Sequence, residues 1–155
     1  MRPLKICIGA SAGGHMNQLL RLLDNAAEWP FQPSVFITTK PELEKKLREK
    51  GKTYNIGECN RYHPMESIKV ITRAFKIMII EKPDVIITTG SLPLALICLT
   101  AKILHKKVIW IDSIANTEKF SLSGRMVYHF ADLFITQWPE LAMNKKKAEY
   151  VGTLL

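Results

Sequence analysis

The chain of 155 residues is long enough for one domain with its own hydrophobic core, which we expect to span residues 1–155. Hydrophobic residues make up 47% and charged residues 23% of it, so the composition excludes wholesale disorder. Lysine and arginine outnumber acids by 22 to 14, and the net charge of +8 favours a polyanionic partner: nucleic acid, an anionic lipid surface or a phosphorylated substrate.

Short apolar runs alternate along the chain with segments of helical period. The predicted strands lie near residues 4–9, 34–38, 53–56, 84–88, 107–112 and 132–136, and the predicted helices near 14–25, 41–50, 64–81, 93–105 and 121–130. This alternation is typical of an α/β fold with a Rossmann-like, doubly wound parallel sheet. Because such sheets bind ligands beyond the carboxyl ends of their strands, the site is expected in the loops that follow them.

The three cysteines are odd in number, widely spaced and never in a C-x-x-C pair, so neither a disulfide framework nor a zinc site is expected. The first apolar run is too short for a signal peptide, and the longest uncharged run, residues 92–101, is about half of the roughly 20 residues that span a bilayer. We expect a cytoplasmic protein that needs no metal or other cofactor.

A glycine-rich loop, Gly9-Ala-Ser-Ala-Gly-Gly-His15, joins the first predicted strand to the first predicted helix. Glycines let a ligand approach the backbone, and the free N–H groups of the first helical turn favour an anion such as a diphosphate. Small residues that merely let the turn pack closely are the alternative. The predicted acceptor- and diphosphate-binding residues are Ser11, Gly13, Gly14 and Asn17 in this region, with Gly90, Ser91, Asp112 and Ser113 after later strands.

His15 stands at the mouth of this predicted site. The positive end of the helix dipole disfavours an imidazolium there, so a neutral ring would be able to accept a proton. His15 is therefore a candidate general base. A histidine that only caps the turn is the alternative.

Two nucleotide-binding motifs are excluded by spacing. The dinucleotide fingerprint requires glycine where Ser11 stands, and the second predicted strand ends at Thr38-Thr39-Lys40 without an acid to hold a ribose. Gly51-Lys52-Thr53 resembles the end of a P-loop, but it joins a helix to a strand, which is the reverse of the required order.

The predicted helix over residues 64–81 carries Lys69, Arg73 and Lys76 on one face, while Phe75 and other apolar residues cover most of its circumference. Such a helix fits docking to an anionic membrane surface, and these four residues are predicted to face the membrane. A large buried helix with a solvated cationic ridge is the alternative. A nucleic-acid partner is not expected, since no binding motif or basic stretch interleaved with aromatics is present.

Several motifs in fixed order resemble a known family: GASAGGH, PDVIITTG, WIDSIANTEKFSLSG, FADLFITQWPE and YVGTLL. This order resembles PssD-type bacterial polysaccharide-synthesis proteins and the membrane-recruiting subunit of the eukaryotic enzyme that adds the second GlcNAc to dolichol diphosphate. More distantly it is similar to the acceptor half of MurG, the peptidoglycan GlcNAc transferase. The resemblance covers nearly the whole chain.

The resemblance implies the N-terminal, acceptor half of a GT-B glycosyltransferase. By it, Gly13, Gly14 and His15 would meet the acceptor, the helix around Arg73 would meet the membrane, and Asp112 and Glu118 would line the cleft. The chain departs from the eukaryotic relatives in lacking their N-terminal anchor, in having Gln18 where they tend to have an acid, and in having Asp112 where they tend to have glutamate.

We therefore expect the acceptor-binding, membrane-associating subunit of a two-chain glycosyltransferase, peripheral on the inner face of the cell membrane. It would help to transfer a hexose from a nucleotide sugar to a polyprenyl-diphosphate-linked sugar in polysaccharide biosynthesis, such as exopolysaccharide or capsule synthesis. His15 or Glu118 would be the base, and a separate chain would bind the donor, since this one stops shortly after Gly152. A non-catalytic membrane scaffold that recruits and activates the partner transferase is the alternative.

Overall fold

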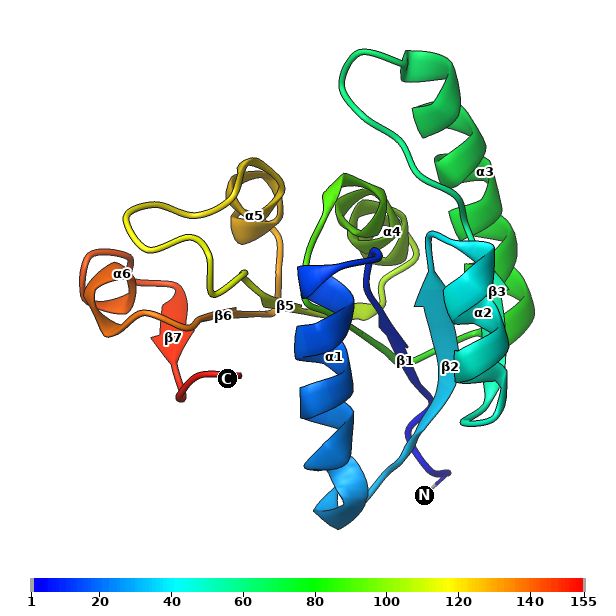
Figure 1. Cartoon of the computed structure of the whole chain (residues 1–155), viewed down its shortest axis with the longest axis horizontal. Coiled ribbons are helices and arrows are strands. Elements are labelled where there is room, and N and C mark those ends of the chain that lie inside the picture. Colours follow the sequence, from blue (N-terminus) through cyan, green and yellow to red (C-terminus); the bar gives the residue numbers. More distant parts are fainter. Residues whose placement is uncertain (1, 155) are drawn as a thin grey trace.

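The computed structural model describes residues 2–154, which form a seven-stranded parallel sheet with helices on both faces (Figure 1). The strands are β1 (Ile6–Gly9), β2 (Pro33–Thr38), β3 (Lys52–Asn55), β4 (Val85–Thr88), β5 (Lys107–Ile111), β6 (Leu133–Thr136) and β7 (Ala148–Tyr150). The helices are α1 (Gly14–Asp24), the 3-10 helix η1 (Ala26–Glu28), α2 (Pro41–Arg48), α3 (Pro64–Glu81), α4 (Leu92–Ile103), α5 (Leu122–Tyr128) and α6 (Pro139–Met143).

The strand order β3-β2-β1-β4-β5-β6-β7 places β1 and β4 side by side at the centre of the sheet. From β1 the chain turns through α1 to β2 on one side, and from β4 it turns through α4 to β5 on the other side. The two connections lead away from each other, so the carboxyl ends of β1 and β4 flank the topological switch point of the sheet, which is called the crevice below. This is the switch point at which doubly wound sheets bind their ligands.

Two hydrophobic cores cover the two faces of the sheet. Met16 and Leu19 of α1 and Leu47 of α2 pack in one core with residues of β1 and β2. The other core is larger and contains buried residues of α3, α4, α5 and α6. Eight residues of α4 are buried, which explains why its sequence carries no charge before Lys102. These close-packed layers give the loops at the carboxyl edge a rigid support.

The predicted doubly wound α/β fold is confirmed, with all six predicted strands and five predicted helices present. Sequence periodicity missed β7 and α6, because three and five residues are too few to show a repeat. The longest connection between elements is 112–121, after β5. No helix within residues 2–154 is both long enough and apolar enough to cross a membrane.

Candidate functional site

The glycine-rich loop leaves β1 at the switch point and opens to solvent at the start of α1. Gly13 has φ of 87°, a left-handed conformation that favours glycine, and no atom lies within 4 Å of a Cβ built on Gly13 or Gly14. The turn is anchored by the Ala12 N–H, which donates to Thr39 Oγ1 at 3.3 Å. An anion therefore has open access to the first-turn N–H groups of α1, which lack partners inside the helix.

His15 is tied to the loop after β4 by two hydrogen bonds. Its Nδ1 lies 2.8 Å from the carbonyl oxygen of Thr89, and Thr89 Oγ1 donates to the carbonyl oxygen of His15 at 2.7 Å. Because a carbonyl only accepts, Nδ1 carries the hydrogen, and in the neutral ring Nε2 keeps its lone pair. The hydrogen bonds thus orient His15, the predicted base. The sequence did not predict the contact between His15 and Thr89.

Gly90 and Ser91 form the other wall of the crevice, before α4. Gly90 has φ of 122°, and a Cβ there would lie 2.8 Å from His15 Cε1, so the imidazole packs directly on this glycine. Ser91 has φ of 96°, which is rare for a residue with a side chain, and its buried Oγ has no hydrogen-bond partner within residues 2–154. Backbone strain and an unpaired hydroxyl at the same place are typical of a ligand site.

A buried polar network joins α1 to the loop after β5. Gln18, 6% exposed, donates through Nε2 to the carbonyl oxygen of Gly14 at 3.3 Å and to Ser113 Oγ at 3.4 Å. Its Oε1 accepts from Gln137 Nε2 at 2.5 Å and from the Ile114 N–H at 3.3 Å. Predicted residue Ser113 is therefore connected to the glycine loop, whereas predicted residue Asn17 is exposed on α1 and makes no side-chain hydrogen bond within residues 2–154.

Asp112 is 1% exposed, and its contacts are internal to the chain. Its carboxylate accepts from Ser121 Oγ at 2.6 Å, the Ser121 N–H at 3.0 Å, Trp110 Nε1 at 3.1 Å and Asn116 Nδ2 at 3.3 Å. These bonds use the usual acceptor capacity of a carboxylate. Asp112 thus shapes the loop and the start of α5, and its predicted contact with a ligand stays a prediction.

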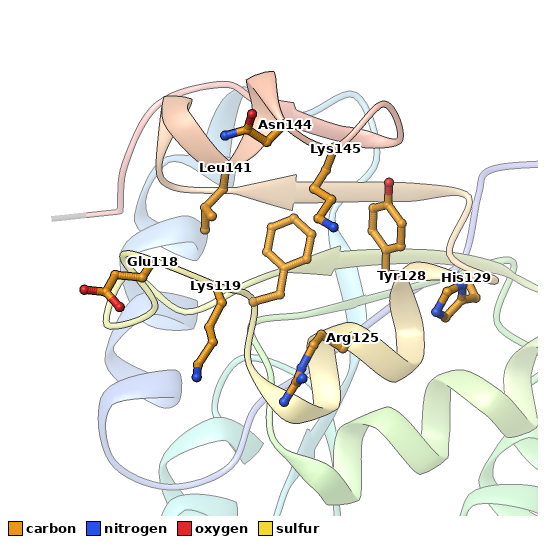
Figure 2. Close-up of a pocket in the computed structure, with 9 residues that line it drawn as sticks. Glu118, Lys119, Arg125, Tyr128, His129, Leu141, Asn144 and Lys145 are labelled. Carbon is orange, nitrogen blue, oxygen red and sulfur yellow. The ribbon is translucent and has the colours of Figure 1, made fainter.

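Glu118 lies later in the same loop, and no hydrogen bond joins it to the network around Gln18. Its side chain is exposed and shares no hydrogen bond or ion pair with any residue from 2 to 154. It lines a pocket that also holds Arg125 and Lys145, and Figure 2 shows its carboxylate turned away from both. His15 is thus held by hydrogen bonds, whereas Glu118 makes none within residues 2–154, and the role of either as the base stays a prediction.

The predicted membrane-facing side chains lie on α3, whose first turns project past the carboxyl edge of the sheet (Figure 1). Lys69 forms an ion pair with Glu66 at 2.9 Å, and Arg73 donates a hydrogen bond to the carbonyl oxygen of Ile56 at 2.8 Å. Arg73 and Lys76 are exposed, and Phe75 is half-buried. The apolar side chains most exposed on this helix are Met65, Ile68, Ile79 and Ile80. Exposed apolar and cationic residues thus share the outer surface of α3.

The open parallel sheet, with an anion-accessible crevice at its switch point, defines a Rossmann-like domain of the kind that forms one half of a GT-B enzyme. The chain belongs to the Alg14-like family, since the family described as "Oligosaccharide biosynthesis protein Alg14 like" matches residues 4–154. It is therefore a member of a family of glycosyltransferase subunits.

Relatives of the chain include the "UDP-N-acetylglucosamine transferase subunit ALG14" of three eukaryotes. The Yarrowia lipolytica protein is 27% identical over 175 residues, covering 97% of this chain and 81% of the relative. The human protein is 26% identical, covering 98% and 83%, and the Rattus norvegicus protein is 38% identical, covering 99% and 84%. The resemblance to bacterial PssD-type proteins remains a prediction, and nothing in these relatives supports exopolysaccharide or capsule synthesis.

Solved structures support the fold. MurG of Acinetobacter baumannii superposes with a TM-score of 0.76 at 16% identity, covering 95% of this chain and 45% of the other. The UDP-GlcNAc 2-epimerase of Methanocaldococcus jannaschii gives 0.74 at 18% identity, covering 97% and 46%. The chain therefore spans less than half the length of these proteins and matches the fold of one part of each.

Proposed function

We propose that this chain is the acceptor-binding subunit of a two-chain glycosyltransferase that transfers a sugar from a nucleotide sugar to a polyprenyl-diphosphate-linked sugar. The observation that carries the proposal is the crevice between β1 and β4, where an open N-terminal helix turn and an oriented histidine lie together. Membership of the Alg14-like family supports the reaction class. Its relatives named for UDP-N-acetylglucosamine make GlcNAc the proposed sugar.

In the proposed complex the acceptor diphosphate lies over Gly13 and Gly14, against the first-turn N–H groups of α1. Ser11 and Asn17 flank this position, and Ser91 lies on the side of β4, where its buried and unpaired hydroxyl would have to turn outward to meet an acceptor oxygen. Ser113 reaches the same region through Gln18. The crevice is thus the proposed binding site for the anionic part of the acceptor.

His15 is the proposed general base. Its Nε2 takes the proton of the acceptor hydroxyl while that oxygen attacks the anomeric carbon of the donor sugar. The new carbon–oxygen bond forms as the anomeric bond to the nucleoside diphosphate breaks, and the diphosphate leaves with the electron pair. This displacement inverts the anomeric configuration. Glu118 is the second candidate, since its exposed carboxylate makes no hydrogen bond or ion pair within residues 2–154 that would orient it.

A separate chain is proposed to bind the nucleotide sugar and to face this crevice. The proposal is supported by relatives that are named as subunits of a transferase. The exposed apolar and cationic surface of α3 is proposed to contact an anionic membrane, which would bring the crevice close to the lipid end of the acceptor.

The acceptor site is tested by NMR on the ¹⁵N-labelled chain, titrated with a water-soluble, short-chain isoprenyl-diphosphate-GlcNAc. We expect the amide signals of residues 11–17 and 89–91 to shift. Gly13→Val should weaken binding by about tenfold or more, because a β-branched residue at φ of 87° distorts the turn. Gly152→Val, which also replaces a glycine with positive φ in open space, is the matched control. Shifts confined to other regions would refute the assigned site.

A further inference from the structure

A second pocket of about 440 Å³ lies between α5 and α6, on the face of the sheet that α3 and α4 also cover (Figure 2). Its volume falls in the range of small-molecule sites. Phe120, Tyr128 and Leu141 line it together with the cations Lys119, Arg125 and Lys145. The proposed acceptor crevice uses none of these residues.

The floor of the pocket is apolar and held in place. Phe120 is 5% exposed, and its ring lies 4.7 Å from that of Phe134 and 5.6 Å from that of Tyr128, centre to centre. The Tyr128 hydroxyl accepts from the Lys147 N–H at 3.2 Å. Ser121, next to Phe120, is fixed by the buried carboxylate of Asp112. The floor is therefore formed before any ligand arrives, which lowers the entropic cost of binding.

The rim of the pocket is cationic. Lys119, Arg125 and Lys145 are exposed and have no ion-pair partner within residues 2–154. Figure 2 shows Lys145 and Arg125 on opposite sides of the pocket, with the carboxylate of Glu118 directed away. Three cations without counter-ions attract a ligand with several acceptor oxygens, and a phosphate has that character.

Exposed apolar side chains also lie on the helices of this layer. They are Ile79 on α3, Leu99 and Ile103 on α4, and Leu122 and Met126 on α5, the helix that lines the pocket. The two on α5 offer an apolar chain that leaves the pocket an apolar surface next to it.

We propose that this pocket binds a lipid phosphate, with the phosphate between Lys119, Arg125 and Lys145 and the first part of the apolar chain on Phe120 and Leu141. The ligand is either an isoprenoid phosphate or an anionic glycerophospholipid, since both carry a phosphate on an apolar chain. This inference is independent of the proposed acceptor site, because it concerns a different face and a different set of residues.

The test is an NMR titration of the ¹⁵N-labelled chain with farnesyl phosphate and, separately, with dihexanoyl phosphatidate below its micelle concentration. Farnesol and inorganic phosphate are the controls for the two halves of the ligand. We expect shifts at residues 119–129 and 141–145 with at least one lipid phosphate, and binding at least about tenfold weaker with either control. The relative affinity of the two lipid phosphates identifies the source.

The triple variant Lys119→Ala, Arg125→Ala, Lys145→Ala should weaken binding by about 100-fold. A control triple variant removes the same charge on and next to α2 and should leave binding of the lipid phosphate unchanged: Lys45→Ala, Lys46→Ala, Lys50→Ala. Leu141→Asn keeps the cations and should also weaken binding, so a folding defect in one variant does not decide the result. Shifts confined to 11–17 and 89–91, or equal binding of inorganic phosphate, would overturn the proposal.

Discussion

His15 shows how a hydrogen bond to the backbone can prepare a side chain for chemistry. The Thr89 carbonyl oxygen, 2.8 Å from Nδ1, fixes the hydrogen on that nitrogen, and the ring packs closely against Gly90. Any larger residue at position 90 would push the ring aside, since a Cβ there lies within 3 Å of two ring atoms. The free Nε2 is thereby presented with a defined direction.

Two substitutions of His15 separate catalysis from positioning. His15→Ala should leave folding and partner binding intact but lower turnover of the assembled complex by about 10²-fold, the effect of losing a general base. His15→Asn places an amide N–H where Nδ1 stands, so it can keep the bond to Thr89 while removing the base, and turnover should fall equally. His105→Asn, at a surface histidine with φ of 58°, is the control.

Steady-state turnover and partner affinity are measured together in these variants. Unchanged turnover in both His15 variants would remove the catalytic role and favour a scaffold that contributes no chemical group. Turnover rescued by His15→Asn alone would mean that the hydrogen bond to Thr89, rather than a proton transfer, is what matters.

At the scale of elements, two buried glutamines hold α1, the loop after β5 and the last residues together. Gln137, 1% exposed, donates to Gln18 and to the carbonyl oxygen of Asp112 at 2.9 Å, and its Oε1 accepts from the Leu154 N–H at 2.8 Å. We predict that Gln18→Ala and Gln137→Ala each lower the free energy of unfolding by about 1–3 kcal/mol, since each leaves buried partners unpaired. In urea denaturation the double variant should lose less than the sum. Strict additivity would show that the two side chains are not coupled.

A buried carboxylate ties α3 to β1 and β3. Glu81, with a side chain 4% exposed, accepts from Lys5 at 2.8 Å and from Lys52 and Tyr54. Burial alone raises the pKa of Glu81, but the hydrogen bonds from Lys5, Lys52 and Tyr54 outweigh it and lower the pKa from 4.5 to about 2.

Because this pKa is lower in the folded state, the carboxylate stabilises the fold fully above pH 4.5 and loses its effect as the pH falls to about 2. Glu81→Gln should therefore cost most stability near neutral pH, and the gap to the wild type should narrow through this range. Denaturant unfolding at several pH values measures the gap, with Glu149→Gln on exposed β7 as control. A gap independent of pH would contradict the assignment.

The outer surface of α3 is the element proposed to meet the membrane. We expect salt-sensitive binding to anionic liposomes, weakened by the triple reversal Lys69→Glu, Arg73→Glu, Lys76→Glu. The same reversal at Lys45, Lys46 and Lys50 gives an equal charge change elsewhere. Because Arg73 also supports the loop at Ile56, Ile68→Ser tests the apolar contribution separately. If co-sedimentation with the liposomes is unaffected by salt and by all these substitutions, α3 does not bind the membrane.

The features that could be predicted from the sequence are those that depend on residues close together in the chain. The spacing of apolar residues predicted the sheet, the run of glycines predicted the glycine loop, and cations three and four residues apart predicted the exposed cations of α3. The Gln18–Gln137 bond joins residues 119 apart, so no local pattern predicts it. No local pattern predicts the position of Glu118 or the burial of Asp112 either, since both depend on the conformation of the 112–121 loop. The threonine pairs that end β2 and precede Gly90 were the one overlooked local signal near the site.

At the scale of the whole molecule, one crevice and one lipid-phosphate pocket lie on a single Rossmann-like sheet. The crevice is assigned to the acceptor, and the sequence carries no dinucleotide fingerprint or P-loop for a nucleotide. In the proposed function, a second polypeptide brings the nucleotide sugar to His15.

Reconstituted transfer tests this claim most directly. GlcNAc transfer from its UDP derivative to a short polyprenyl-diphosphate-linked sugar is measured with this chain alone, with a co-expressed donor-domain protein alone, and with both. We predict product only when both chains are present, and loss of about 99% of that rate with His15→Ala, the 10²-fold effect of a missing general base. Turnover by this chain alone would contradict it.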